Sequence, residues 1–299
     1  MANTALVPVD PTRLMYNLPD NIFPAGMKAR FLAQGDSWFS IGAIPPGLTG
    51  NIIQSISLSQ PCAVVNCARP GKILQSMMDN MKDPMFVTLL SDPKFSVEFD
   101  AILISGGGND VIDAAGVLPG QVDPVYQPLF LDVAARGGVK VAPAAYLNQP
   151  GWADLAGKLT ATFNQLIADR DKSVNKNKPL FLHSYAYCMP RPAGAVPGFG
   201  PWLYPAMNAY AIDPSDQLAV SKLLMDHMAT LYTDLIKAKM TADPQCNIYL
   251  IDTCKDVPLV LADPKSTGDS NDWINEIHPN YSGYGKLGAA WSAALEKIL

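Results

Sequence analysis

Five short runs of almost continuous apolar residues recur along the chain, and they constrain the fold more than any other feature. The runs read ARFLAQ, CAVVNCA, FDAILISG, KPLFLHS and CNIYLID. Strands that are buried on both faces have this pattern, whereas a strand with one face in water alternates apolar and polar residues. We therefore expect five strands in a mainly parallel sheet.

Helical patterns separate several of these runs. Apolar side chains recur at the spacing of one helix face between residues 152 and 169, and again in the segment 213–238. Asp213 and Pro214 suit the N-cap and the first position of this second helix. The last 15 or so residues repeat the helical spacing. Strands that alternate with helices predict an α/β fold in which the sheet lies between two helix layers, a three-layer α/β/α sandwich.

The chain is long enough for one large domain or two small ones. We expect residues 28–299 to form a single domain that follows an N-terminal arm at residues 1–27. Two segments, at about 111–150 and 188–212, are rich in Pro and Gly and also carry aromatic residues. Long loops within a compact domain are usually functional or disordered. Their aromatic content favours insertions that form ordered walls over a substrate cleft.

Charge and composition argue against several classes of protein. The formal net charge is −5 and there is no basic run, which disfavours a nucleic-acid partner because phosphate neutralisation needs clustered Lys and Arg. No apolar stretch approaches the roughly 20 residues of a membrane-spanning helix. The N-terminus has no basic start followed by an apolar core, so we expect no signal peptide and a cytoplasmic protein. The five cysteines lack metal-ligand spacing, and we expect neither a metal site nor a disulfide framework.

Polar residues follow several of the expected strands. In open α/β sheets, ligands bind beyond the carboxyl ends of the strands, where Ser37, Asn109 and His183 would meet. Ser37 has two interpretations: it caps the next helix, or it is a nucleophile held at the edge of the sheet. We expect the neighbouring Asp36 and Asp110 to be structural and to bind loop N–H groups.

A serine nucleophile needs a base for its proton and hydrogen-bond donors for the oxyanion that develops during acyl transfer. Four separate stretches could supply these groups. They are Gly-Asp-Ser with Ser37, NCARPG with the backbone N–H of Gly71, GGND with the side-chain amide of Asn109, and NEIHPN with His278.

Taken in order, these stretches resemble the motifs of the SGNH, or GDSL-type, hydrolases over residues 31 to about 290. The resemblance implies a flavodoxin-like α/β/α fold and ester hydrolysis or acyl transfer without a metal or cofactor. It implies that Ser37 is the nucleophile and His278 the general base. The implied oxyanion hole consists of the backbone N–H groups of Ser37 and Gly71 and the side-chain amide of Asn109.

The sequence departs from the family pattern at one position. The acid that orients the histidine stands three residues before it in the family, and here that place holds Asn275. An amide oxygen can accept the imidazole N–H, but it stabilises the imidazolium less than a carboxylate does. In serine proteases an Asp→Asn change in this role costs about 10⁴ in turnover. Asp252, Asp272 and Glu276 are other carboxylates that could orient His278.

These observations predict a serine esterase or lipase-like hydrolase whose substrate is a small-molecule, lipid or carbohydrate ester. Trp202 and Tyr204 are candidates to line the cleft, and His183 is either a cleft residue or a buried, hydrogen-bonded one. A carbohydrate O-deacetylase or an acyltransferase would use the same site, and Asn275 motivates a catalytically weak ligand-binding protein. A nucleotide-binding module is disfavoured because GGGND lacks the Gly-x-Gly-x-x-Gly spacing and the Walker lysine. No oligomeric state is predicted.

Overall fold

The centre of the computed structural model, which describes residues 3–16, 23–40 and 50–299, is a six-stranded sheet. Across the sheet the strands are β2 (Val7–Val9), β5 (Cys62–Asn66), β3 (Ala29–Gly35), β6 (Ala101–Ser105), β7 (Leu180–His183) and β8 (Ile248–Ile251). Every neighbouring pair is parallel. Without β2, the order is the 2-1-3-4-5 of flavodoxin-like folds. The predicted α/β class and mainly parallel sheet are therefore confirmed.

The predicted number of five strands is wrong, because β2 adds a sixth strand at the edge of the sheet. Its sequence is only Val-Pro-Val, and proline normally argues against a strand because it has no N–H for the ladder. An edge position tolerates Pro8, because an edge strand pairs on one side only. This strand belongs to the predicted N-terminal arm, of which residues 1–2 and 17–22 lie outside the described residues. The boundary at residue 28 stays a prediction.

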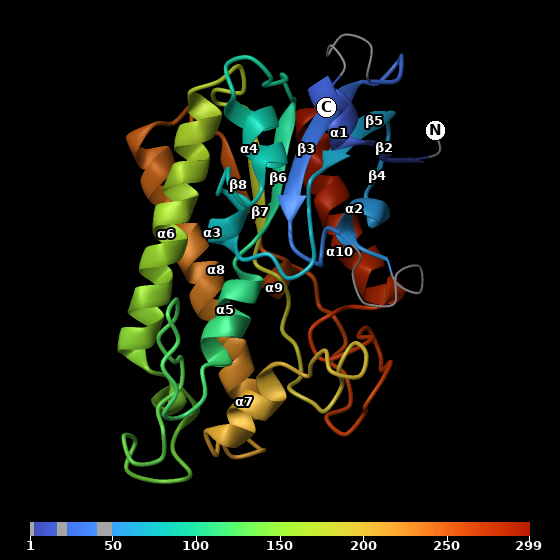
Figure 1. The fold of residues 1–299 in the computed structure, drawn as a ribbon. Helices are drawn as coiled ribbons and strands as arrows, with labels where there is room; N and C mark the ends of the chain where they lie inside the picture. The colour runs from blue at the N-terminus through green and yellow to red at the C-terminus, as the bar shows by residue number, and fades with distance from the viewer. Residues whose placement is uncertain (1–2, 17–22, 41–49) are drawn as a thin grey trace.

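Helices cover both faces of the sheet (Figure 1). On one face α10 (Tyr281–Leu295) packs against α2 (Ile52–Ser55). On the other face α6 (Gln149–Asp171) contacts four helices, α3 (Leu74–Met77), α4 (Pro84–Ser91), α5 (Gly108–Ala115) and α8 (Gln217–Ala242). The remaining short elements are β1 (Thr4–Ala5) paired with β4 (Ser57–Leu58), α1 (Pro11–Tyr16), α7 (Leu203–Ala209), α9 (Thr253–Asp256) and the 3-10 helices η2 (Pro143–Tyr146) and η3 (Glu296–Ile298).

Burial explains why the strands appear as continuous apolar runs. All residues of β6 and β7 are buried, and in β3 only Arg30 is exposed. The last run is the exception, because β8 lies at an edge and Tyr249 is exposed there. Helix α8 begins at Gln217 rather than at Pro214, because residues 214–216 form a turn in which the carboxylate of Asp213 accepts the N–H and hydroxyl of Ser215.

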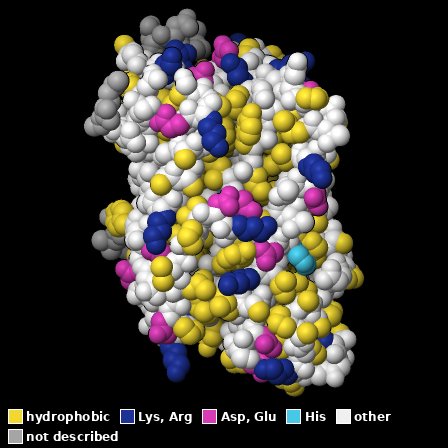
Figure 2. Space-filling view, turned by 180° about the vertical axis from the view of Figure 1, so that it is seen from behind, with side chains coloured by type: hydrophobic (Ala, Val, Ile, Leu, Met, Phe, Trp, Pro, Cys, Tyr) yellow, Lys and Arg dark blue, Asp and Glu magenta, His cyan; other side chains and the backbone are white. Residues whose placement is uncertain are grey.

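The two predicted insertions lie beyond the carboxyl ends of the strands, in the lower half of Figure 1, together with α5 and α7. Among the described residues, no helix has the length and hydropathy needed to cross a membrane. The same residues contain no group of three or more His, Cys, Asp or Glu placed to hold a metal ion. On the face shown in Figure 2, Lys and Arg side chains are scattered among Asp and Glu rather than gathered in one patch.

Candidate active site

The turn that follows β3 presents Ser37 at the edge of the sheet. Gly35 ends the strand where β6 is so close that a Cβ atom would lie 2.8 Å from the Cβ of Ser105, which only glycine avoids. The carboxylate of Asp36 then closes the turn by accepting the N–H of Trp38 at 2.9 Å and the hydroxyls of Ser105 and Tyr185. Burial raises the pKa of Asp36 to about 6. Asp36 thus binds a loop N–H group at the end of its strand, as the sequence predicts.

Ser37 meets His278 across 241 positions of sequence. The Oγ atom of Ser37 lies 2.7 Å from Nε2 of His278, and only 9% and 6% of the two residues are exposed. His278 sits just before α10, whose N-cap Asn280 accepts the N–H of Gly283 at 3.1 Å. A nucleophile within hydrogen-bond reach of its base is the arrangement that covalent catalysis requires.

Asn275 orients the imidazole of His278. Its Oδ1 accepts the backbone N–H groups of Ile277 at 3.2 Å and His278 at 2.9 Å, and lies 3.0 Å from ring Nδ1. Backbone N–H groups can only donate, so the atom of the Asn275 amide that they contact must be the oxygen. They therefore settle the orientation of the amide, which the distance to the ring alone would leave open. Nδ1 must then carry the proton, and Nε2 is free to accept one from Ser37.

The other nearby carboxylates are engaged elsewhere. Asp272 binds Lys286, and Asp252 accepts the hydroxyl of Ser184 at 2.7 Å. Glu276 accepts backbone N–H groups from the second insertion. The imidazole therefore has an amide rather than a carboxylate as its partner, and burial lowers the pKa of His278 to about 4. At neutral pH the imidazole is therefore uncharged and can accept a proton.

Asn109 stands beside Ser37 in the first turn of α5. Both residues line one cavity, and the Nδ2 of Asn109 donates to the carbonyl of Lys72 at 3.0 Å. Gly71 precedes Lys72 and has the positive φ of 71° that favours glycine, but it is exposed and does not line this cavity. The structure thus brings together Ser37, Asn109 and His278, whereas the contribution of the Gly71 N–H stays a prediction.

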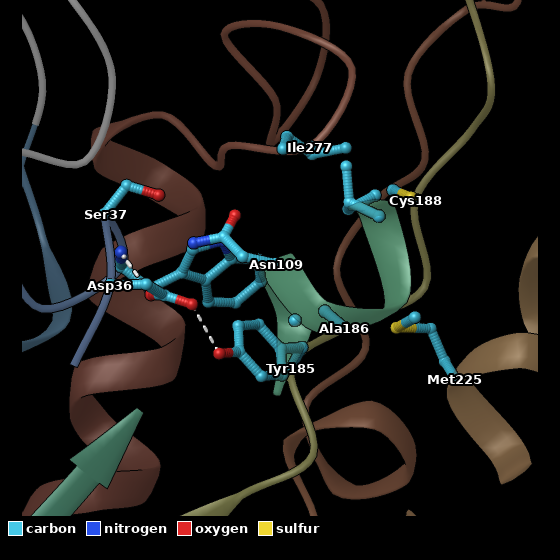
Figure 3. A pocket seen from close by; sticks show the side chains of 11 residues that line it. Asp36, Ser37, Asn109, Tyr185, Ala186, Cys188, Met225 and Ile277 are labelled. Atoms are coloured by element: carbon cyan, nitrogen blue, oxygen red, sulfur yellow. Dashed lines mark hydrogen bonds between the residues drawn. The ribbon is translucent and has the colours of Figure 1, made fainter. Parts of the chain in front are cut away.

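The cavity beside Ser37 is small and is largely apolar beyond the reacting groups. Figure 3 shows Ser37 on one side, Cys188 and Met225 on the other, and Asn109 between them. The lining residues are Asp36, Ser37, Trp38, Gly108, Asn109, Ile112, Tyr185, Ala186, Cys188, Met225 and Ile277. The sequence did not indicate Cys188, Met225 or Ile277, because buried apolar residues have the same pattern in a core and in a pocket wall.

The three predicted cleft residues occupy different places. His183 is fully buried, stacks on Phe39 and lies 2.9 Å from the hydroxyl of Ser105, and burial lowers its pKa to about 3. It does not line the cavity. Trp202 packs with its ring at 76° to the ring of His278, the centroids 5.5 Å apart. Tyr204 donates its backbone N–H to Glu276 at 2.6 Å.

Comparison with known proteins finds similarity in structure only. No family model and no curated protein matches the sequence. The chain is similar to an extracellular lipase from Streptomyces rimosus, with 14% identity, 91% of this chain and 100% of that chain covered, and a TM-score of 0.47. It is also similar to a catalytic mutant of an acetylxylan esterase from Geobacillus stearothermophilus, with 13% identity, 92% and 96% covered, and a TM-score of 0.46. Similarity of this degree does not assign an activity.

Proposed function

We propose that the protein is a serine hydrolase of the SGNH type that cleaves carboxylic esters through an acyl-enzyme on Ser37. One observation carries the proposal. The Oγ of Ser37 lies 2.7 Å from Nε2 of His278, whose Nδ1 lies 3.0 Å from Oδ1 of Asn275, and the three residues meet beyond the ends of a parallel sheet. These groups can activate a hydroxyl without a metal or cofactor.

The proposed reaction has two steps. His278 takes the proton of Ser37 while Oγ attacks the ester carbonyl, and the oxyanion is held by the N–H of Ser37, the N–H of Gly71 and the amide of Asn109. The imidazolium then gives its proton to the oxygen of the leaving alcohol. In the second step His278 takes a proton from a water molecule, which attacks the acyl carbonyl. The bond between the acyl carbon and Oγ then breaks, the acid leaves, and the imidazolium returns its proton to Oγ of Ser37.

Asn109 has a specific part in this scheme that a mutation can isolate. Asn109→Ala removes a donor to the oxyanion without touching Ser37 or His278, so kcat should fall about 10²–10³-fold with little change in KM. Steady-state kinetics with p-nitrophenyl acetate measures both constants. Asn208→Ala serves as a control, because that side chain accepts a hydrogen bond from Gln217 away from the site. An unchanged kcat in Asn109→Ala would remove Asn109 from the oxyanion hole.

The positions of His278 and Trp202 suggest which part of the ester lies on which side. The leaving oxygen must be within reach of Nε2, so the alcohol would extend towards Trp202, which packs against the imidazole. There a larger cavity is lined by Trp202, Tyr126, Asp113 and Asp123. The acyl group would then enter the apolar cavity towards Cys188 and Met225. Ile112 lines both cavities.

Turnover of p-nitrophenyl esters of increasing chain length tests the function and the acyl pocket together. Because Cys188 and Met225 line the side of the small apolar cavity away from Ser37 (Figure 3), acetate and butyrate should be cleaved faster than longer esters. Met225→Ala should raise kcat/KM for the octanoate ester about tenfold, since each methylene that gains burial contributes about 0.8 kcal/mol. Met225→Leu, which conserves volume, should leave the profile unchanged. A profile that stays the same in Met225→Ala would mean that the acyl chain lies elsewhere.

A carbohydrate O-deacetylase is the second candidate, and the larger cavity favours it. Aromatic rings stack on sugar faces, and the carboxylates of Asp113 and Asp123 could accept hydrogen bonds from sugar hydroxyls. An acetylated sugar should then be a better substrate than p-nitrophenyl acetate by kcat/KM. An acyltransferase would instead give transfer to an added alcohol in preference to hydrolysis. A ligand-binding protein without activity would turn over none of these esters.

A further inference from the structure

Glu276 joins the catalytic loop to the second insertion. The residue is 1% exposed, and its carboxylate accepts the backbone N–H groups of Arg191 at 3.3 Å, Leu203 at 3.0 Å and Tyr204 at 2.6 Å, together with that of Trp202. Its own backbone N–H donates to the carbonyl of Ala193 at 2.9 Å. All of these partners lie within residues 188–212. One buried side chain thus fixes the start of α7 against the loop that carries His278.

The residue fixed most directly by this carboxylate is Trp202. Its backbone N–H binds Glu276, and its ring packs against the imidazole of His278 with the centroids 5.5 Å apart. The catalytic imidazole is therefore held from two sides. Asn275 binds Nδ1 at 3.0 Å, and Trp202 packs on the ring.

The neutral side chain at position 275 makes this second constraint important. A carboxylate would hold the imidazolium by charge as well as by geometry, and charge-assisted hydrogen bonds are roughly twice as strong as neutral ones. In this chain the hydrogen bond to Nδ1 is neutral before the proton transfer, so the ring has more freedom to turn away from Ser37. A misplacement of about 1 Å can cost about 10² in rate.

We propose that Glu276 is a positioning residue, which holds Trp202 against His278 and so keeps the imidazole directed at Ser37 in the absence of a triad carboxylate. Glu276 does not touch the reacting atoms. It acts through the backbone of residues 202–204 and the ring of Trp202. The proposal rests on the proposed function of Ser37 and His278.

Two variants test this role, Glu276→Gln and Trp202→Leu. Glutamine keeps the shape of the side chain but replaces one acceptor oxygen by an NH₂ group, which cannot accept the N–H groups that converge there. Glu276→Gln should lower kcat for p-nitrophenyl acetate about tenfold or more, with KM within about threefold. Trp202→Leu should lower kcat by a similar factor and also raise KM, because Trp202 lines the cavity proposed for the alcohol. The rate at which a fluorophosphonate labels Ser37 should fall in parallel, because that reaction needs the same Ser37–His278 pair.

The decisive measurement repeats both variants in an Asn275→Asp background. There a carboxylate holds the ring, so the loss caused by Glu276→Gln or Trp202→Leu should shrink to about threefold or less. Asn175→Ala is the control for stability, because Asn175 is fully buried and binds Leu90, Val97 and Phe99 away from the site. It should lower the melting temperature without lowering kcat in either background.

The outcomes separate this role from a purely structural one and from failure of the proposed function. If Glu276→Gln and Trp202→Leu keep kcat within about twofold, or lose the same factor in both backgrounds, the positioning role is wrong. If Glu276→Gln does not fold, Trp202→Leu alone decides by the same criterion. If the native protein neither turns over esters nor reacts with the fluorophosphonate at Ser37, the proposed function fails, and this role fails with it.

Discussion

Replacing Ser37 by alanine should lower kcat for ester hydrolysis about 10⁴–10⁶-fold, because the change removes the atom that forms the acyl-enzyme. Residual catalysis from the oxyanion hole and substrate binding would remain, since these groups keep some rate enhancement without a nucleophile. The melting temperature should change little, because the hydroxyl's hydrogen bond is to His278 and the Asp36 turn stays intact. Kinetics with p-nitrophenyl acetate and a thermal melt measure the two effects separately.

Controls for the Ser37→Ala variant come from the same chain. His278→Ala should lose about as much, and Ser37→Ala with His278→Ala together should lose no more than either alone, because the two residues act as one unit. Ser292→Ala removes a half-buried hydroxyl on α10 that accepts the N–H of Ser57, and it should keep full activity. Native turnover in Ser37→Ala would show that a different residue attacks the ester.

Replacing Asn275 by aspartate should raise kcat about 10²-fold or more. The carboxylate would stabilise the imidazolium that forms when Ser37 loses its proton, and the reverse change in a serine protease costs about 10⁴. The gain should fall short of that factor for a reason visible in the structure. Nδ2 of Asn275 is buried without a hydrogen-bond partner, so the second carboxylate oxygen in its place would also lack one. That burial should cost about 1–3 kcal/mol of stability.

The pH profile provides an independent measure of the Asn275→Asp change. Only the neutral imidazole accepts the proton of Ser37, so activity is present above the pKa of His278 and is lost as the pH falls through it. With burial lowering that pKa to about 4, kcat/KM of the native protein should stay level from pH 8 to about 5. The carboxylate of Asn275→Asp favours the charged imidazole and so raises the pKa of His278. The loss of kcat/KM at low pH should then begin nearer the ordinary pKa of histidine, about 6.5. An unchanged kcat and acid limb would mean that Asn275 does not orient His278.

Most of the strands could be predicted from the sequence. Strands β3, β5, β6 and β7 are buried on both faces, and their sequences are therefore almost continuous apolar runs. Such runs can be recognised without knowing which strands pair with them. Strand β2 could not be predicted in the same way, because the segment Val7–Val9 becomes a strand through its pairing with β5. Its three residues and its proline carry no strand pattern of their own.

The candidate site, too, could be predicted in part. Ser37, Asn109 and His278 follow recognisable turns, and parallel strands bring their carboxyl ends to one edge, so the sequence could place them together. The contacts of Glu276 could not be predicted, because its donors lie more than 70 positions away in a loop whose path no local pattern fixes. The position of His183 beneath the site likewise depends on the packing of Phe39 over it.

The most direct test of the central claim is the intact mass of the protein after treatment with a fluorophosphonate, followed by peptide mapping of the adduct. The Ser37–His278 pair predicts one adduct, on Ser37, in the native protein. It predicts no adduct in Ser37→Ala and a much slower reaction in His278→Ala. An adduct on another residue, or none on the native protein, would contradict the assignment of Ser37 as the nucleophile.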